Sequence, residues 1–574
     1  MPRSVTNSLL HRKANKFFFL FIITIIIFPF KAIAQNLPPS DQPGAQGSRF
    51  KAESEQGKKR LEKEKVQAPQ IAIEKEKAKP SLEQGPSFVL KNVKITGFTI
   101  FKLEDLQPVY ESYIGKLVTF KNLEDIAAGI KARYKQKGYL STTAYIPEQD
   151  IAQGEVEIRV VEGKLGDVKV EGNKWFDSSI LRKFIHLKKN ELLNIFKLQR
   201  DMIRLNQNPD LEVTAVVSPG KEPASTDIVL KVKDSIPYHA GLNFDNQGTR
   251  LVGKYRSSLA LRSTNLTGLF DSLSFNGLVS ADSLGEFISY ALPLDTCGTK
   301  AGLDLTFFKM KLGKEFRDLD ITGSTSIMTP HISRELYLSE DFQAYADAGI
   351  DIKVIKKKNA GELVTNDQIR MPYVAVDLAK SDTFLGGGQT VFTPRVSVSV
   401  EHFLGASSRA HPSASRPGTG GAFVKYEQTI KRIQRAAFNS FISARSQFQA
   451  ASRTLPSSEQ IQLGGLNSVR GYPEGEYLAD MGGTLNAEWA FPRAIKPLQK
   501  YLYPVAFTDM AAGLLKNTGS GEKRHRFLMG AGAGLRFQIN KYFFLRMDWA
   551  KRLGDRPTQG QGPSTFYITA QCEI

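Results

Sequence analysis

The residue types that most often carry catalysis are sparse and scattered along this 574-residue chain. Its seven histidines are dispersed, and the sequence holds no Gly-x-x-x-x-Gly-Lys-Ser/Thr, no His-Glu-x-x-His and no Gly-x-Ser-x-Gly. Those motifs would cradle a nucleotide phosphate, bind a catalytic zinc ion or expose a nucleophilic serine. The sequence therefore predicts neither an enzyme, nor a bound cofactor, nor a metal site.

One charge pair near the C-terminus could do a different kind of chemistry, which is to fix a loop. An arginine removed from water needs a carboxylate, and its planar fork holds a loop more firmly than an ammonium group would. Asp509 follows Phe507 by two residues in an alternating segment, so both side chains share one face of a strand. From the residues alone, Arg470 can also be a loop arginine in water. The residues of this candidate loop-fixing site are Val469, Arg470, Gly471, Tyr472, Phe507 and Asp509.

The elements that would position this pair are long alternating segments in residues 236–574. Met529, Ala531, Ala533, Leu535 and Phe537 form an apolar row that alternates with glycines and polar residues. Soluble β-sandwiches also alternate, but their strands average five or six residues, whereas these segments have the length of tilted transmembrane strands. The region predicts an outer-membrane β-barrel of about 16 antiparallel strands.

The polar rows of such a barrel face a lumen, which is aqueous at this number of strands. A basic, wet lumen suits an extended polypeptide or an anionic solute. The arginines on these rows are Arg256, Arg262, Arg395, Arg445, Arg536 and Arg546.

The two cysteines, Cys297 and Cys572, fall near the same rim of this barrel but several strands apart. Adjacent strands are about 4.8 Å apart, and a disulfide needs Cα atoms within roughly 7 Å. We therefore expect two free thiols.

Two similar modules precede the barrel, at 87–163 and 164–235. Each has the order strand, helix, helix, strand, strand, which indicates an internal repeat of a small α+β domain. In the first module, the strand from Tyr139 to Ile146 is the predicted sheet edge.

The N-terminal region has the features of an export signal. Basic residues, an apolar run from Phe17 to Phe30 and Ala32-Ile33-Ala34 predict a signal peptide at 1–34, the alternative being a retained membrane helix. Residues 35–86 predict a flexible linker that contains a charged helix, Phe50–Val66. That helix is either solvated or a removable pore plug. The net charge of +19 permits anionic partners, but no nucleic-acid motif is present, so we expect no nucleic-acid partner.

The whole arrangement resembles a two-partner secretion transporter, the TpsB branch (ShlB/FhaC/HecB type) of the Omp85 superfamily. The modules are similar to POTRA domains, with LNQNPD at 205–210 in the second. The VRGY tetrapeptide, residues 469–472, resembles the tip of the family's sixth extracellular loop. The loop, around 464–480 here, folds into the barrel, where Asp509 is its expected partner. The motif of the first barrel hairpin is carried by Asp245, Asn246, Gly248 and Gly253.

Two positions depart from the family pattern. Ala511 stands where a glycine is expected, and the chain ends in Ile574 rather than an aromatic residue. The first change tightens the space beside the loop tip, and the second concerns recognition by the barrel assembly machinery.

The resemblance implies a location in the outer membrane of a Gram-negative bacterium, with the POTRA domains in the periplasm. It implies export of an unfolded TpsA-like partner protein through the lumen without nucleotide hydrolysis. The outer-membrane lipid and, during biogenesis, the barrel assembly machinery are further implied partners. The expected docking edge is Tyr139, Leu140, Thr142, Ala144, Tyr145 and Ile146.

The alternative function is that of an assembly factor that inserts other barrels, and it would share the Arg470 loop. Such factors resemble chains with three or more periplasmic modules, whereas this chain has two. A diffusion porin or receptor would leave the modules without a purpose.

Overall fold

The computed structural model describes residues 41–63, 71–73, 87–151, 153–409, 411–492, 501–518, 522–539, 542–558 and 562–573. The predicted signal peptide and most of the predicted linker lie outside these ranges. Within them, no helix is long and apolar enough to cross a membrane.

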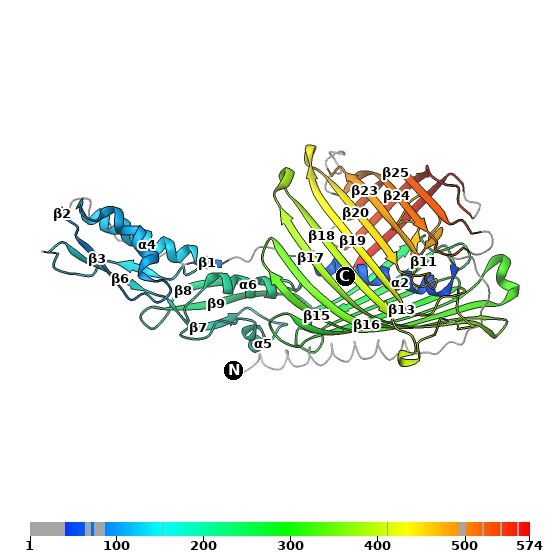
Figure 1. The fold of residues 1–574 in the computed structure, drawn as a ribbon, viewed down its shortest axis with the longest axis horizontal. Helices are drawn as coiled ribbons and strands as arrows, with labels where there is room; N and C mark the ends of the chain where they lie inside the picture. Colours follow the sequence, from blue (N-terminus) through cyan, green and yellow to red (C-terminus); the bar gives the residue numbers. More distant parts are fainter. Residues whose placement is uncertain are drawn as a thin grey trace, which may run out of the picture.

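The C-terminal region is a closed antiparallel barrel, which confirms the predicted fold class (Figure 1). Along β26, Asp548 is fully buried towards the interior while Trp549 is half exposed on the outside, as strand alternation requires. Its sixteen strands in the described chain are β10 (Tyr238–Asp245), β11 (Arg256–Ser263), β12 (Ser272–Ser280), β13 (Ser283–Pro293), β14 (Thr299–Lys311), β15 (Ile321–Leu338), β16 (Phe342–Asn359), β17 (Glu362–Asp382), β18 (Gly388–Ser399), β19 (Phe423–Ala436), β20 (Ser440–Ala451), β23 (Met481–Ala490), β24 (Leu502–Leu514), β25 (His525–Ile539), β26 (Phe543–Arg552) and β27 (Ser564–Glu573).

The barrel closes where β27 pairs with β10, over the five residue pairs from Gly241–Glu573 to Asp245–Thr569. By comparison, β16 and β17 pair along almost their whole length. Short 3-10 helices occupy several barrel connections: η3 (Lys314–Leu319), η4 (Phe384–Gly386), η5 (Phe403–Gly405) and η6 (Ala437–Asn439).

Loop 6, residues 452–480, connects β20 to β23 and carries a hairpin of its own, β21 (Ile461–Leu463) with β22 (Tyr477–Ala479). Buried apolar residues of this hairpin pack with residues of β24 and β25, so the loop lies against the inner side of the wall.

The first module builds a three-stranded sheet in the order β3-β6-β5, with β5 at one edge. Helix α4 covers it, and Leu123, Ile126 and Ile130 of α4 are fully buried in its core. Its elements are β2 (Phe88–Val89), β3 (Asn92–Thr96), α3 (Leu103–Tyr110), η2 (Glu111–Tyr113), β4 (Leu117–Val118), α4 (Phe120–Gln136), β5 (Thr143–Tyr145) and β6 (Glu155–Val161).

The second module builds a sheet in the order β1-β8-β9-β7, packed against two helices. Strand β1 comes from the region predicted to be a flexible linker and pairs in parallel with β8, which the sequence did not predict. The elements are β1 (Ile71–Ile73), β7 (Lys164–Glu171), α5 (Ser178–Lys183), α6 (Ile195–Asn206), β8 (Leu211–Pro219) and β9 (Ser225–Asp234).

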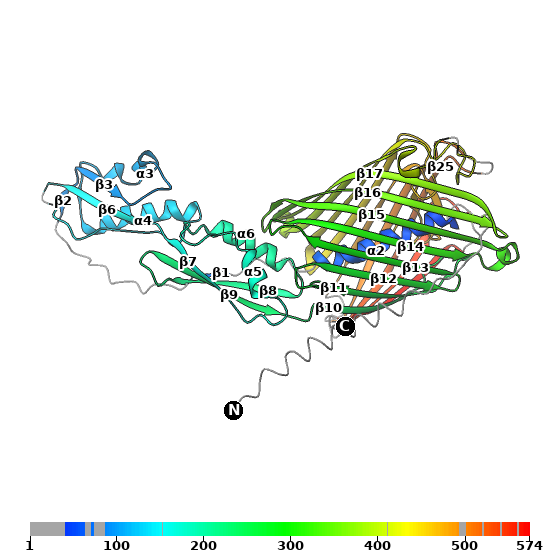
Figure 2. The same ribbon diagram turned by 90° about the horizontal axis from the view of Figure 1, so that it is seen from below.

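The second module is clamped to the barrel end from which β10 starts. Arg204 of α6 donates two hydrogen bonds to the carboxylate of Glu335 in β15, at 3.0 and 2.6 Å. Phe270, in the β11–β12 turn, packs its ring against Phe184 of the module, with 4.7 Å between ring centroids. The two modules and the barrel therefore extend in a row (Figures 1 and 2).

Helix α2 (Pro43–Lys63) runs inside the barrel, along the inner face of β13 to β16 (Figure 2). It begins seven residues before the predicted start at Phe50. Of the two readings that the sequence left open, a solvated helix and a helix in the pore, the structure places α2 in the pore.

Candidate functional site

The tip of loop 6 reaches β24 through Arg470. Its Nε and Nη2 donate to the two oxygens of Asp509 at 2.7 and 3.0 Å, which is the two-pronged geometry that only a guanidinium can make. The Arg470 backbone N–H donates to the same carboxylate at 3.1 Å, and the guanidinium lies 3.4 Å from the ring centroid of Phe507. Arg470 is only 3% exposed and Asp509 is fully buried, so the structure brings the predicted pair together out of bulk water.

Apolar and backbone contacts hold the residues on either side of Arg470. Val469 and Tyr472 are fully buried in one cluster with Ala511, the alanine that departs from the family pattern. Gly471 has φ +98°, a conformation that favours glycine, and its N–H donates to the hydroxyl of Tyr567 at 3.0 Å. The wall makes room as well, because a Cβ on Gly530 would come within 1.9 Å of the carbonyl oxygen of Arg470.

Further acidic residues around Arg470 were missed by sequence reasoning. Its Nη1 also donates to Glu488 of β23 at 2.9 Å and lies 3.3 Å from Asp548 of β26. Arg536 and Arg546 converge on the same Asp548, each at 2.6 Å. Strand alternation places Asp548 on the inner face of β26, but alternation cannot show which strands face each other across a lumen.

The motif of the first barrel hairpin stabilises the closure of the barrel. Asp245 accepts two hydrogen bonds from Arg256, at 2.8 and 3.1 Å. The side chain of Asn246 accepts from the N–H of Ile568 at 3.0 Å and donates to the carbonyl of Phe566 at 2.9 Å, so it extends the β10–β27 pairing. Gly248 and Gly253 allow the tight turn, since a Cβ on Gly248 would lie 1.8 Å from the Gly253 carbonyl oxygen.

Charged residues of α2 pair with the wall and with loop 6. Lys51 donates to Asp351 of β16 at 2.9 Å, and Glu53 pairs with Arg256 of β11 at 3.0 Å. Arg49 lies 3.3 Å from Glu474 of loop 6, and Gln462 of loop 6 donates to the Ala45 carbonyl at 2.6 Å. These polar contacts therefore link the helix to strands β11 and β16 and to the inward-folded loop.

One aromatic side chain anchors α2 in an apolar part of the lumen. Phe50 is 2% exposed and lies 5.9 Å, centroid to centroid, from Phe308. Phe50 belongs to one buried apolar cluster with residues of β12 to β15 and of the connecting loops: Leu251, Val252, Leu278, Phe287, Met310, Leu312 and Ile321.

Four of the six predicted lumen arginines pair with acidic residues of the lumen. Arg395 pairs with Asp351 at 2.6 Å, and Arg256, Arg536 and Arg546 have the carboxylate partners described above. Arg445 lines an inner cavity of about 300 Å³ beside α2 and loop 6. Two buried guanidinium nitrogens of Arg262 and one of Arg445 meet no hydrogen-bond partner among the described residues.

Comparisons with known proteins agree with this architecture. The family model described as haemolysin secretion/activation protein ShlB/FhaC/HecB matches residues 224–537, which is more than half of the chain. The chain belongs to this family. POTRA models match residues 88–163 and 164–234, which are the two modules described above.

The same relationship is seen in individual proteins. The heme/hemopexin transporter protein HuxB of Haemophilus influenzae is 25% identical over 78% of this chain and 80% of its own length. The structure of CdiB from Escherichia coli superposes with a TM-score of 0.71 at 18% identity, covering 94% of this chain and all of that one. BamA from Haemophilus ducreyi, lacking POTRA domains 1–3, has a TM-score of 0.51 at 14% identity over 85% of this chain and all of its own, which shows a shared fold.

The chain is therefore an outer-membrane transporter of the two-partner secretion family, with its POTRA modules in the periplasm. The family is one of protein transporters and not of enzymes.

The predicted docking edge of the first POTRA module is shorter than expected. Only Thr143 to Tyr145 form the edge strand β5, paired on one side with β6. Leu140 instead packs against the core of the second module, and Thr142 is buried. Tyr139 and Ile146 pack on the core of the first module, so the free edge consists of β5 alone.

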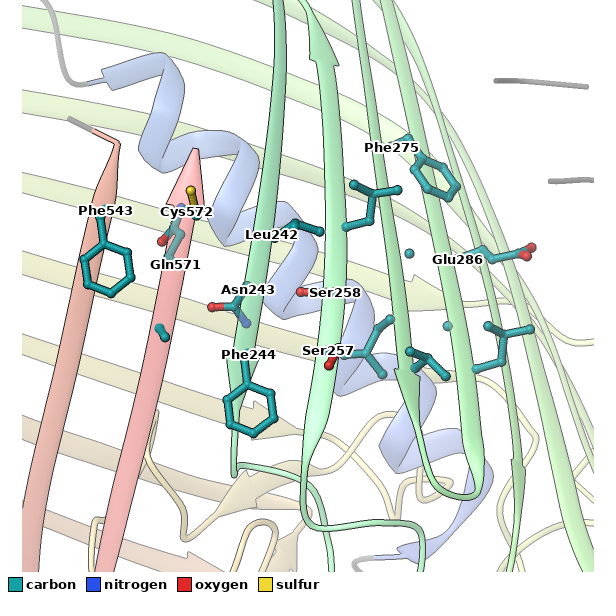
Figure 3. A pocket seen from close by; sticks show the side chains of 17 residues that line it. Leu242, Asn243, Phe244, Ser257, Ser258, Phe275, Glu286, Phe543, Gln571 and Cys572 are labelled. Carbon is teal, nitrogen blue, oxygen red and sulfur yellow. The ribbon is translucent and has the colours of Figure 1, made fainter. Parts of the chain in front are cut away.

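An apolar groove of about 590 Å³ lies on the outer side of the barrel closure (Figure 3). Leu242 and Phe244 of β10 and Cys572 of β27 point away from α2 there, and so face the membrane. Both cysteines are free and exposed, and Cys572 meets this groove rather than a second sulfur.

Proposed function

We propose that this transporter exports one unfolded partner protein through its lumen, and that α2 must leave the lumen first. The observation that carries the proposal is the position of α2, which fills the path between loop 6 and the strands β13 to β16. Its contacts are mostly charge pairs and hydrogen bonds, which water or a polar chain in transit can replace. The passenger is a TpsA-like exoprotein in this proposal.

Capture takes place at β5 of the first POTRA module. An extended segment of the passenger adds a strand there, because backbone pairing tolerates many sequences. Folding of the passenger outside the cell supplies direction, and no nucleotide is hydrolysed. The Arg470–Asp509 pair acts as the lock that keeps loop 6 inside the barrel during this cycle. Outer-membrane lipid surrounds the wall, and the barrel assembly machinery inserts it.

Locking α2 in place tests the proposal directly. Asn276 of β12 donates to the hydroxyl of Ser54 at 2.8 Å, so Ser54→Cys with Asn276→Cys can be joined by a short thiol cross-linker in a background with Cys297→Ser and Cys572→Ser. We expect cross-linked cells to stop exporting the partner and uncross-linked cells to export it. Each single-cysteine variant is the control. Continued export with α2 fully cross-linked would contradict the proposal.

The capture site needs a separate test. Consecutive amides of a strand point to opposite sides, so Ala144→Pro and Tyr145→Pro remove one donor that faces outwards and one that faces β6. One of the two variants should lower export while the first module keeps its thermal stability. Unchanged export in both would place capture elsewhere.

Gene deletion separates export from the assembly-factor alternative. Loss of one protein from the medium, with the outer-membrane barrels intact, supports export. Loss of many barrels from the membrane would favour assembly instead. Family membership favours export, whereas the fold shared with BamA fits both functions.

A further inference from the structure

A histidine, a carboxylate and a thiol meet at the periplasmic joint between the second POTRA module and the barrel. His186 follows α5, Asp201 lies in α6, and Cys297 lies in the turn between β13 and β14. Asp201 Oδ1 is 2.8 Å from His186 Nδ1, and Cys297 Sγ is 3.4 Å from Nε2, the opposite ring nitrogen. None of these groups takes part in the proposed transport cycle.

Asp201 sets the orientation and the tautomer of the ring. Its Oδ2 accepts from the His186 backbone N–H at 2.8 Å, and Arg204 Nη1 approaches Oδ1 at 3.3 Å. Asp201 thus acts as an acceptor, which assigns the ring proton to Nδ1 and leaves the lone pair of Nε2 facing two donors, the hydroxyl of Thr296 at 2.9 Å and the thiol of Cys297 at 3.4 Å. This is the arrangement by which a carboxylate orients a histidine that serves as base to a nucleophile.

The turn that carries the thiol is held in place and open to solvent. Asp295 Oδ1 accepts from the backbone N–H of Cys297 at 2.8 Å and of Thr299 at 2.9 Å, while Arg334 pairs with its other oxygen at 2.7 Å. Cys297 is exposed, and the ring of His186 is one-third exposed. A small molecule can therefore reach the sulfur while the base stays in contact with it.

The geometry does not suit a metal ion. Asp201 and Cys297 lie against opposite nitrogens of one ring, so their donor atoms do not converge on a common point. Across the described residues, no group of three His, Cys, Asp or Glu side chains is arranged to hold a metal.

We propose that Cys297, with His186 and Asp201, is a thiol activated for exchange with disulfides, and hence a redox modification site at the joint. His186 Nε2 takes the proton from Sγ, and the thiolate attacks one sulfur of an incoming disulfide. The new S–S bond forms as the old one breaks, and the leaving thiolate takes the proton from the imidazolium. The exchange needs no other oxidant, and the periplasm is an oxidising compartment in which disulfides persist.

The mixed disulfide at Cys297 would weaken the contact between the second POTRA module and the barrel. A mixed disulfide has no S–H to donate to Nε2, so the contact between Sγ and the ring loses its hydrogen bond. The turn is linked to the neighbouring ion pair because Glu335 N–H donates to the Gly298 carbonyl at 3.0 Å. Glu335 also accepts a hydrogen bond from Arg204. Modification of Cys297 should therefore weaken the Arg204–Glu335 ion pair of the joint.

The test measures the rate at which the detergent-purified full chain reacts with dithiodipyridine, a small uncharged disulfide. In a Cys572→Ser background only Cys297 reacts, and His186→Gln should slow it about tenfold at neutral pH, because an unassisted thiol is only a few per cent ionised there. Free imidazole should restore the rate of His186→Gly. The Cys297→Ser chain, which keeps Cys572, reports the effect of imidazole on an unassisted thiol.

A second histidine at the same joint supplies the matched control. His239 pairs with Asp210 at 2.9 Å, and no thiol is bonded to it in the described chain, so His239→Gln disturbs the joint without removing the base. It should leave the Cys297 rate unchanged. Loosening the joint would expose the sulfur and raise its reaction rate. A rate that falls in His186→Gln but not in His239→Gln therefore identifies His186 as the base. Equal rates in His186→Gln and the parent, or equal slowing in both histidine variants, would overturn the proposal.

Discussion

Loop 6 and helix α2 both lie in the lumen as two stoppers, and different kinds of contact hold each of them in place. Loop 6 combines a buried two-pronged Arg470–Asp509 pair with an apolar cluster that contains Val469 and Tyr472. Helix α2 has one buried aromatic anchor, Phe50, and otherwise pairs its charges with the wall and the loop. The difference indicates that loop 6 is a fixed part of the barrel and that α2 is a part that can leave.

The contrast depends on whether the charged residues of the barrel wall keep an ion-pair partner when α2 or the tip of loop 6 leaves. If α2 leaves, Arg256 still has Asp245, and Asp351 still has Arg395 and Lys353 within 4 Å. If Arg470 leaves, Asn486 at 2.9 Å is the one side-chain donor that Asp509 keeps among the described residues, in a fully buried position. At Arg256 and Asp351, therefore, the wall can lose α2 without leaving a buried charge unpaired, whereas at Asp509 it cannot lose the loop tip in that way.

Arg470→Ala should produce the largest effect, because it removes the partner of a buried carboxylate. Breaking a buried ion pair from one side costs about 3–5 kcal/mol. We expect a lower unfolding temperature of the purified barrel, measured by the heat-dependent shift of its band in gels, and loss of export. Arg432→Ala is the control, since its pair with Asp382 is more than a quarter exposed on both sides and should contribute little, so the unfolding temperature should stay nearly unchanged. Equal effects of the two changes would remove the distinction between the stoppers.

Phe50→Ala should act on α2 and spare the barrel. Truncating a buried Phe costs about 3 kcal/mol or more, which shifts the ratio of inserted to released helix roughly a hundredfold. Single-channel recordings in planar bilayers should show longer open times, while the unfolding temperature of the barrel stays the same. Gly57→Ala is the control, because a Cβ there meets nothing within 4 Å and favours the helix. A lower barrel stability in Phe50→Ala would mean that α2 is structural.

The sequence predicted one of these stoppers better than the other, for physical reasons. Arg470 and Asp509 could be paired because the loop motif resembles a family pattern and strand alternation fixes the face of Asp509. Alternation also placed the lumen arginines on the inner rows. It could not identify Glu488 or Asp548 as neighbours of Arg470, since distance across a lumen depends on barrel closure and loop folding.

The N-terminal segments α2 and β1 show more clearly what could not be predicted from the sequence. The charges of α2 at i,i+4 spacing indicate a helix in water as well as in a polar lumen, so the sequence left its location open. Strand β1 is three residues long, and its partner β8 lies about 140 residues further along the chain. A short apolar triplet within a polar linker carries no signal for such a long-range pairing.

Glu53→Gln tests whether the charge pairs of α2 are individually weak. Arg256 keeps its two hydrogen bonds to Asp245, and Arg49 keeps its contact with Glu474, so the loss should be about 1–2 kcal/mol. Channel open times should lengthen about tenfold, less than in Phe50→Ala, and increasing salt should reduce the difference from the parent chain. An effect larger than that of Phe50→Ala would make charge, and not the aromatic anchor, the main hold on α2.

The smallest effect at neutral pH is expected outside the lumen, at Asp210 of the joint. Burial acts to raise the pKa of Asp210, but hydrogen bonds from His239 and Thr264, at 2.9 and 2.6 Å, outweigh it and lower the pKa below its ordinary value. A carboxyl whose pKa is lowered by folding contributes stability above its unfolded pKa of about 3.9, and that contribution is lost as the pH falls through the folded pKa. The unfolding temperature of the second module, followed by calorimetry, should therefore be flat from neutral pH to about pH 5 and fall below about pH 4.

Asp210→Asn should remove part of that acid dependence, whereas Arg470→Ala should leave it intact because the Arg470–Asp509 pair lies in the barrel. If Arg470→Ala flattened the acid dependence as much as Asp210→Asn does, the joint and the lock would unfold as one unit, and the separation of the molecule into a fixed loop, a movable helix and an independent clamp would be wrong.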